Sequence, residues 1–161
     1  MSCGSTKHAA SSQGAAKSSS SETKRLQEKY ASILGVSSFE ISDIKLYHFI
    51  DDWMNAPYQY GGKSKSGVDC SGFAERLQED VYGRKICCSS LEIFSECTSI
   101  STKDLREGDM VFFKINSASV SHMGVYLANH KFVHASTQAG VIISDLNDAY
   151  YQKYFYKAGR L

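Results

Sequence analysis

The stretch of sequence that decides the fold is GVDCSGF, at residues 67–73. It places the thiol of Cys70 at the first position of a predicted helix, because Asp69 before it is a favoured N-cap residue. Apolar residues then recur at every fourth position: Phe73, Leu77 and Val81. The opposite face carries polar residues, Gln78 among them, and Gly83 ends the helix. A cysteine at this end of a helix lies beside unpaired N–H groups and the positive end of the helix dipole, which favours the nucleophilic thiolate over the thiol.

The composition indicates a single domain that follows a polar N-terminal segment. The chain has 161 residues, of which 42% are hydrophobic, and a formal net charge of +1, so it can bury a core and offers no basic surface for nucleic acid. No apolar run approaches the ~18 residues that would span a bilayer. Residues 1–21 hold eight serines and no large apolar residue after Met1. Such a segment cannot offset its ordering entropy, so we predict a flexible tether over residues 1–21 and one domain over residues 22–161.

The other four cysteines fall into two groups. Cys3, at the head of the Ser-rich tether, resembles the lipid-bearing first residue of a mature bacterial lipoprotein, and the alternative is an accidental cysteine in a disordered tail. Cys87, Cys88 and Cys97 bring the total to five, and an odd count argues against a closed disulfide framework. The adjacent pair lacks the C-x-x-C spacing of a zinc site, so we predict no metal site and expect all three to be buried free thiols.

Helices come first along the chain and strands follow. Apolar periodicity predicts helices at residues 22–34, 42–54, 70–82 and 90–97, the last of them opened by a capping box from Ser89 to Glu92. Runs of β-forming residues with short connections predict strands at residues 110–113, 122–127, 131–135 and 140–143, and the Tyr-rich end, residues 149–161, predicts one more. This order predicts an α+β fold in which the strands form an antiparallel meander.

A thiol nucleophile needs a base, and the base needs a third group that orients it. Cys70 alone is equally compatible with a small apolar residue packed under a loop, but the strands offer three candidate bases: His122, His130 and His134. If residues 128–130 form a three-residue loop, the register places His122 and His134 on one face of the sheet as diagonal neighbours. A two-residue turn would place them on opposite faces.

The three-residue loop has two further consequences. It pairs Leu127 with Lys131 and Gly124 with His134, so that the glycine leaves room for the imidazole opposite it. The last residue of such a loop usually has a positive φ, which histidine tolerates, so His130 is predicted to be a turn residue rather than a catalytic one. The alternative is that His122 and His134 are isolated histidines on two strands, with no shared role.

Five motifs occur in a fixed order: PYxYGG at residues 57–62, GxDCSGF at 67–73, GDMVFF at 108–113, HMGVY at 122–126 and FVHAS at 132–136. In this order they resemble the motifs of the NlpC family of bacterial cell-wall cysteine peptidases, over roughly residues 40–161. The segment GVIIS and the Tyr-rich end are most similar to those of the Spr-type murein endopeptidase lipoproteins. The resemblance implies a papain-like α+β fold, with the catalytic cysteine at a helix N-terminus packed on an antiparallel sheet.

The resemblance also implies a division of catalytic roles. Cys70 is the nucleophile, and His122 is the base that takes its proton and returns it to the leaving amine. His134 is the polar third member that orients His122.

Three further residues are implied to contact substrate: Tyr58, Asp69 and Ser71. Tyr58 lines the cleft beside the thiol and helps to stabilise the oxyanion, together with the backbone N–H of Cys70. Asp69 and Ser71 match positions that in some family members hold the free amine of a stem peptide, although Asp69 would also serve simply as a helix cap.

The implied function is hydrolysis of peptidoglycan stem peptides or crosslinks through a thioester acyl-enzyme, with no cofactor and no metal. The D-Ala–diaminopimelate crosslink is the favoured bond, and the D-Glu–diaminopimelate stem bond is the alternative. The protein would then act in the periplasm, held at the outer membrane by a lipid on Cys3. Two other functions stay open: a related Cys-dependent amidase or acyltransferase, and an inactive cell-wall binding module, which three filled catalytic positions disfavour.

Overall fold

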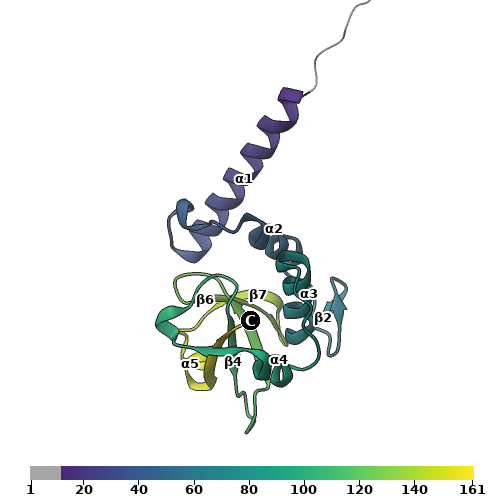
Figure 1. Cartoon of the computed structure of the whole chain (residues 1–161), viewed down its shortest axis with the longest axis vertical. Coiled ribbons are helices and arrows are strands. Elements are labelled where there is room, and N and C mark those ends of the chain that lie inside the picture. Colours follow the sequence, from purple (N-terminus) through teal and green to yellow (C-terminus); the bar gives the residue numbers. More distant parts are fainter. Residues whose placement is uncertain (1–11) are drawn as a thin grey trace, which may run out of the picture.

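The N-terminal helix is longer than the sequence pattern predicts. The computed structural model describes residues 12–161, with side chains from residue 20 onward, and helix α1 covers Ser12–Leu34 (Figure 1). The predicted start at residue 22 was wrong, because serine is only a mildly poor helix former and a helix packed at one end extends at one hydrogen bond per residue. Residues 12–21, within the segment predicted as a tether, are therefore helical, and Cys3 lies outside the described residues.

The packed half of α1 meets the second helix. Tyr30 and Leu34 are fully buried, whereas the neighbouring Ile33 is 41% exposed. A 3₁₀ turn, η1 (Ser38–Glu40), leads to α2 (Ile44–Trp53), which lies within the predicted range of residues 42–54.

Helix α3 (Cys70–Tyr82) begins and ends where the sequence predicts. The Asp69 carboxylate accepts a hydrogen bond from the N–H of Gly72 at 2.7 Å, and Gly83 ends the helix in the left-handed region, with a φ of +67°. The three residues predicted to face the core are buried, but so is Gln78, which was predicted to lie on the polar face. Helix α4 (Ser90–Glu96) opens with the predicted capping box.

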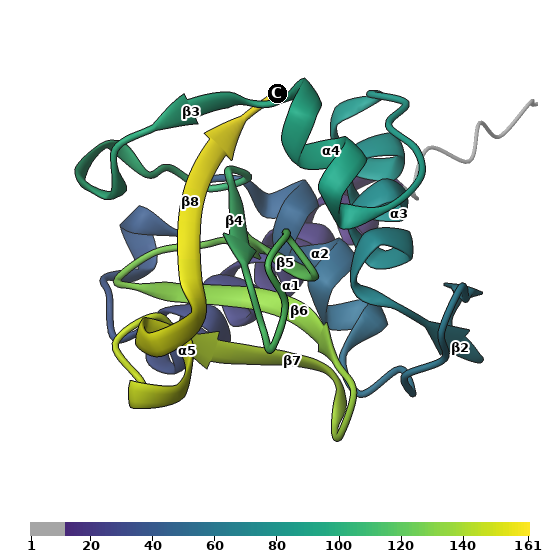
Figure 2. The same cartoon turned by 90° about the horizontal axis from the view of Figure 1, so that it is seen from below.

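The strands form a six-stranded antiparallel sheet in the order β3-β8-β4-β5-β6-β7. Their bounds are β3 (Thr98–Ile100), β4 (Met110–Phe113), β5 (His122–Tyr126), β6 (Lys131–Ser136), β7 (Gly140–Asp145) and β8 (Phe155–Arg160). Strands β4 to β7 form the predicted meander. The Tyr-rich end supplies the predicted extra strand, β8, which returns beside β4, but it also forms an unpredicted helix, α5 (Ala149–Tyr154) (Figure 2). A short hairpin, β1 (Lys63–Ser64) with β2 (Gly67–Val68), precedes α3, and a second 3₁₀ turn, η2 (Thr102–Asp104), follows β3.

Both faces of the sheet are covered by helices. Alternate residues such as Met123, Val125 and Val133 belong to the core shared with α1 and α2, which lie behind the strands in Figure 2, and with α3, which lies to their right. The residues between them face α5, where Phe113 and Phe132 form a second, smaller cluster with Tyr151. Because side chains alternate along a strand, His122 and His134 lie on this second face. Among the described residues, none of the helices is long and apolar enough to cross a membrane.

Candidate active site

The β5–β6 hairpin has the register that a three-residue loop predicts. Val125 pairs with Val133, and the N–H of Leu127 donates to the carbonyl of Lys131 at 2.9 Å. Nε2 of His122 and Nδ1 of His134 are 2.8 Å apart, in a buried hydrogen bond. The prediction that these two histidines share a face is therefore confirmed, and their imidazole rings are hydrogen-bonded to each other.

Local backbone geometry at the hairpin also agrees with the prediction. His130 has a φ of +64°, so it is the predicted turn residue, and it is exposed. A Cβ at Gly124 would lie 2.6 Å from the Phe132 ring and 3.2 Å from Cβ of His134. The glycine is thus required by the close approach of the neighbouring strand that carries His134.

One cleft brings the predicted residues together. It has a volume of about 530 Å³, and its lining includes Tyr58, Cys70, His122 and His134, together with Tyr150 and Tyr151 from α5. Cys70 reaches it from the start of α3, and the two histidines reach it from the sheet. The backbone N–H of Met123, next to His122, is a hydrogen-bond partner of the Cys70 sulfur, which ties the helix start to strand β5.

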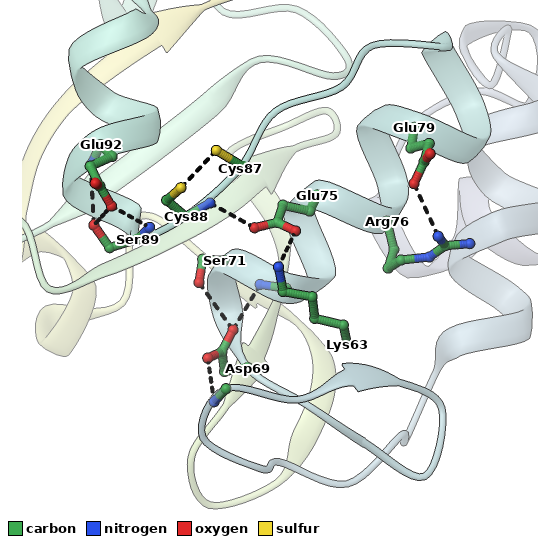
Figure 3. A network of polar contacts seen from close by, with 12 residues as sticks. Lys63, Asp69, Ser71, Glu75, Arg76, Glu79, Cys87, Cys88, Ser89 and Glu92 are labelled. Carbon is green, nitrogen blue, oxygen red and sulfur yellow. Dashed lines mark hydrogen bonds and ion pairs between the residues drawn. The ribbon is translucent and has the colours of Figure 1, made fainter.

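Asp69 and Ser71 lie beside Cys70 but are not among the residues that line this cleft. The Asp69 carboxylate accepts from the N–H of Gly61 and of Gly72, each at 2.7 Å, and from the Ser71 hydroxyl at 3.1 Å (Figure 3). All three donors belong to the chain itself, so the structure shows Asp69 as a helix cap that also fastens the loop before α3.

The protonation states differ from the sequence expectation. Burial raises the pKa of the Cys70 thiol to about 11, although hydrogen bonds from backbone N–H groups, that of Met123 first, act in the opposite direction. The expectation that the helix start favours a thiolate was therefore wrong. The cost of removing the charged thiolate from water is larger than the stabilisation that the helix N-terminus provides. Burial lowers the pKa of His122 to about 4 and that of His134 to about 3, so both imidazoles are neutral at pH 7.

Two residues that the sequence did not predict, Ser144 and Tyr151, extend the hydrogen-bond network of the histidine pair. Nε2 of His134 lies 3.0 Å from Oγ of Ser144 and 3.1 Å from the hydroxyl of Tyr151, and the Ser144 hydroxyl donates to Tyr151 at 3.3 Å. Strand alternation along β7 could have found Ser144, which is on the same face as His134. Tyr151 belongs to α5, a helix that the sequence did not indicate.

This hydrogen-bond network can hold His122 in the tautomer whose Nδ1 is free to accept a proton. If Nε2–H of His122 donates to Nδ1 of His134, then Nδ1 of His122 keeps its lone pair, and Nε2–H of His134 donates to Ser144 or Tyr151. The reverse direction would leave the proton of His122 on Nδ1 and no lone pair to accept another.

A thiol at a helix start and a histidine pair on an antiparallel sheet, facing one cleft, define the class of papain-like α+β proteins. Within this class the chain belongs to the NlpC/P60 family, whose profile matches residues 55–160.

Known relatives agree with this membership. The chain is 41% identical over 110 residues to the murein DD-endopeptidase MepS/murein LD-carboxypeptidase of Escherichia coli K12, covering 68% of this chain and 58% of that protein. It is 39% identical over 113 residues to the "Probable endopeptidase NlpC" of the same strain, covering 70% of this chain and 73% of that protein. The crystal structure of an NlpC/P60 family protein from Bacillus cereus superposes with a TM-score of 0.68 at 25% identity, covering 74% of this chain and 40% of that one. The chain thus spans little more than half the length of the first of these relatives.

Proposed function

We propose that the protein is a peptidoglycan endopeptidase that hydrolyses peptide bonds of stem peptides or of the crosslinks between them. The observation that carries this proposal is the cleft whose lining includes both Cys70 and the hydrogen-bonded pair of His122 and His134. The two Escherichia coli relatives, both named as endopeptidases, support the same reaction class.

In the proposed mechanism, Sγ of Cys70 attacks the substrate carbonyl while its proton passes to Nδ1 of His122. The tetrahedral intermediate collapses, the C–N bond breaks, and the amine leaves with that proton, so that a thioester joins the acyl group to Cys70. Water then attacks the thioester, gives a proton to His122, and releases the acid as the proton returns to the thiol. Because the resting thiol has a raised pKa, the proton transfer belongs to the attack itself rather than to a preformed ion pair.

Tyr58 is proposed to donate a hydrogen bond to the oxyanion. It lines the cleft, and its pKa is raised, by burial first and then by Cys70, so its hydroxyl keeps its proton at neutral pH. The backbone N–H of Cys70 is the proposed second donor. The amine-binding role of Asp69 and Ser71 stays a prediction, and the three hydrogen bonds that Asp69 already accepts within the chain weigh against it.

The D-Ala–diaminopimelate crosslink is the proposed bond, with the D-Glu–diaminopimelate stem bond as the alternative. The proposed location is the bacterial envelope, on the periplasmic side of an outer membrane to which a lipid on Cys3 would attach the chain. Mass spectrometry of an intact N-terminal peptide from a bacterial host would detect that lipid or exclude it.

Digestion of defined crosslinked and uncrosslinked muropeptides, with products identified by mass, tests the function. The wild-type protein is expected to release monomers from crosslinked dimers, and Cys70→Ala is expected to abolish cleavage while the circular dichroism spectrum stays unchanged. Release of an intact stem peptide from the glycan would instead indicate an amidase, and a transferred acyl group would indicate an acyltransferase. Cleavage by the alanine variant would overturn the mechanism, and binding to sacculi without any product would indicate a binding module.

A further inference from the structure

A pair of adjacent thiols lies outside the cleft, in the loop between α3 and α4. Cys87 and Cys88 are both exposed, and their sulfur atoms are 2.6 Å apart (Figure 3). The expectation that these thiols are buried was wrong, because the loop runs over the surface before the capping box of α4. Both sulfurs are therefore open to reagents in solution and within reach of each other.

The backbone around the pair is fixed on both sides. The N–H of Cys88 donates to Oε1 of Glu75 on α3 at 2.8 Å, and Oε2 of Glu75 accepts from Lys63 at 2.6 Å. Ser89, the next residue, caps α4. Cys88 itself has a φ of +86°, a conformation that L-residues rarely adopt and that these contacts hold in place. The loop thus presents the two sulfurs in one arrangement.

The remaining described thiols are less accessible. Burial raises the pKa of Cys70 and of Cys97 to about 11 in each case, and both side chains are partly covered. In the exposed pair, the hydrogen bond with Cys87 is the first cause that raises the pKa of Cys88 to about 11, and either sulfur can be the donor of that bond. Either sulfur can therefore attack first, with the other within reach to complete the reaction.

We propose that Cys87 and Cys88 form a redox site, at which a small-molecule disulfide converts the two thiols into a vicinal disulfide while Cys70 stays reduced. The thiolate of one cysteine of the pair attacks one sulfur of the small disulfide, forms a mixed disulfide and releases one small thiolate. The thiolate of the other cysteine then attacks the protein sulfur of the mixed disulfide and releases the second small thiolate. The sum is two protein thiols and one small disulfide giving one protein disulfide and two small thiols, and excess small thiol reverses it.

Treatment of the folded full-length chain with oxidised glutathione tests this proposal. After alkylation and digestion, the peptide that contains both cysteines is expected to have lost two hydrogens, to carry neither glutathione nor alkyl groups, and to regain two alkylation sites after reduction. Cys70 is expected to be alkylated once the protein is unfolded. A stable glutathione adduct, a disulfide-linked dimer, or earlier oxidation of Cys70 or Cys97 would overturn the proposal.

Three variants separate the roles within this site. Cys88→Ser is expected to stop the reaction at the mixed disulfide, so that glutathione stays on Cys87, whereas Cys97→Ser is expected to behave as the wild type. Glu75→Ala removes the acceptor that holds the N–H of Cys88, so the mixed disulfide is expected to last about fivefold longer. Closure at the wild-type rate in the Glu75 variant would show that the loop does not need this contact.

Discussion

At the scale of single residues, the histidine pair can be separated into base and orienting group by substitution. His134→Ala removes the acceptor of Nε2–H of His122, so kcat is expected to fall by about 10²–10⁴-fold, as it does when a triad base loses its orienting partner. His134→Asn offers a side-chain carbonyl oxygen at a similar position and is expected to keep part of the lost rate. Steady-state kinetics on a muropeptide substrate measures both.

The chain provides a matched control for this experiment in His130. It is exposed, lies in the hairpin turn, and is expected to leave kcat unchanged when replaced by alanine. Equal losses in the alanine and asparagine variants of His134 would mean that its hydrogen bond to His122 does not set the rate.

The sequence predicted these residues to different extents, for physical reasons. The position of Cys70 at a helix start and of His122 and His134 on one face followed from a helix-cap pattern and from strand parity, whereas their catalytic roles were implied only by the family resemblance. Tyr151 could not be predicted in the same way, because its contact with His134 depends on how the chain folds back after β7. The raised pKa of Cys70 could not be predicted from the sequence either, because the burial of its side chain depends on how α3 packs against the sheet.

At the scale of secondary-structure elements, the β5–β6 hairpin depends on the small size of one residue. In Gly124→Ala the new Cβ would meet the Phe132 ring at 2.6 Å and the Val133 carbonyl oxygen at 2.9 Å, so one of the strands must shift. We expect a loss of about 1–3 kcal/mol in the free energy of unfolding. Because Val133 precedes His134 on the same strand, kcat should fall as well.

Gly83→Ala at the end of α3 is the comparison for this element. It also strains a left-handed residue, but its Cβ would meet nothing within 4 Å. Urea denaturation should show a smaller loss, and kcat should not change. A Gly124 variant with wild-type stability and rate would mean that the strands adjust without displacing the imidazole.

Element boundaries were predictable where a cap residue marks them. The start and end of α3 follow from Asp69 and Gly83, and the start of α4 follows from its capping box. The start of α1 has no unique signal, because it lies in a Ser-rich stretch in which any of several serines could serve as a cap. Helix α5 was missed although Asp148 stands at its N-cap position, because its tyrosines are equally typical of strands.

At the scale of the whole molecule, the two buried histidines link stability to pH. Burial lowers their folded pKa values to about 4 and about 3, whereas in the unfolded chain they titrate near 6.5. Their contribution to stability is therefore complete above about pH 6.5 and is lost as the pH falls towards 4, because the unfolded chain binds protons first. Between pH 7 and pH 5 each histidine should remove about 2 kcal/mol from the free energy of unfolding.

Urea denaturation at a series of pH values between 7 and 5 measures this loss. The quantity to compare is the slope of the free energy of unfolding against pH, not its absolute value. The double variant His122→Gln with His134→Gln should flatten the curve, whereas replacing the exposed His130 should leave it as in the wild type. Glu107 acts in the opposite sense, since burial raises its pKa and its protonation favours the folded state, so Glu107→Gln should steepen the loss. A curve that is equally steep in the double histidine variant would place the titrating groups elsewhere and would mean that the pair is not held neutral by the fold.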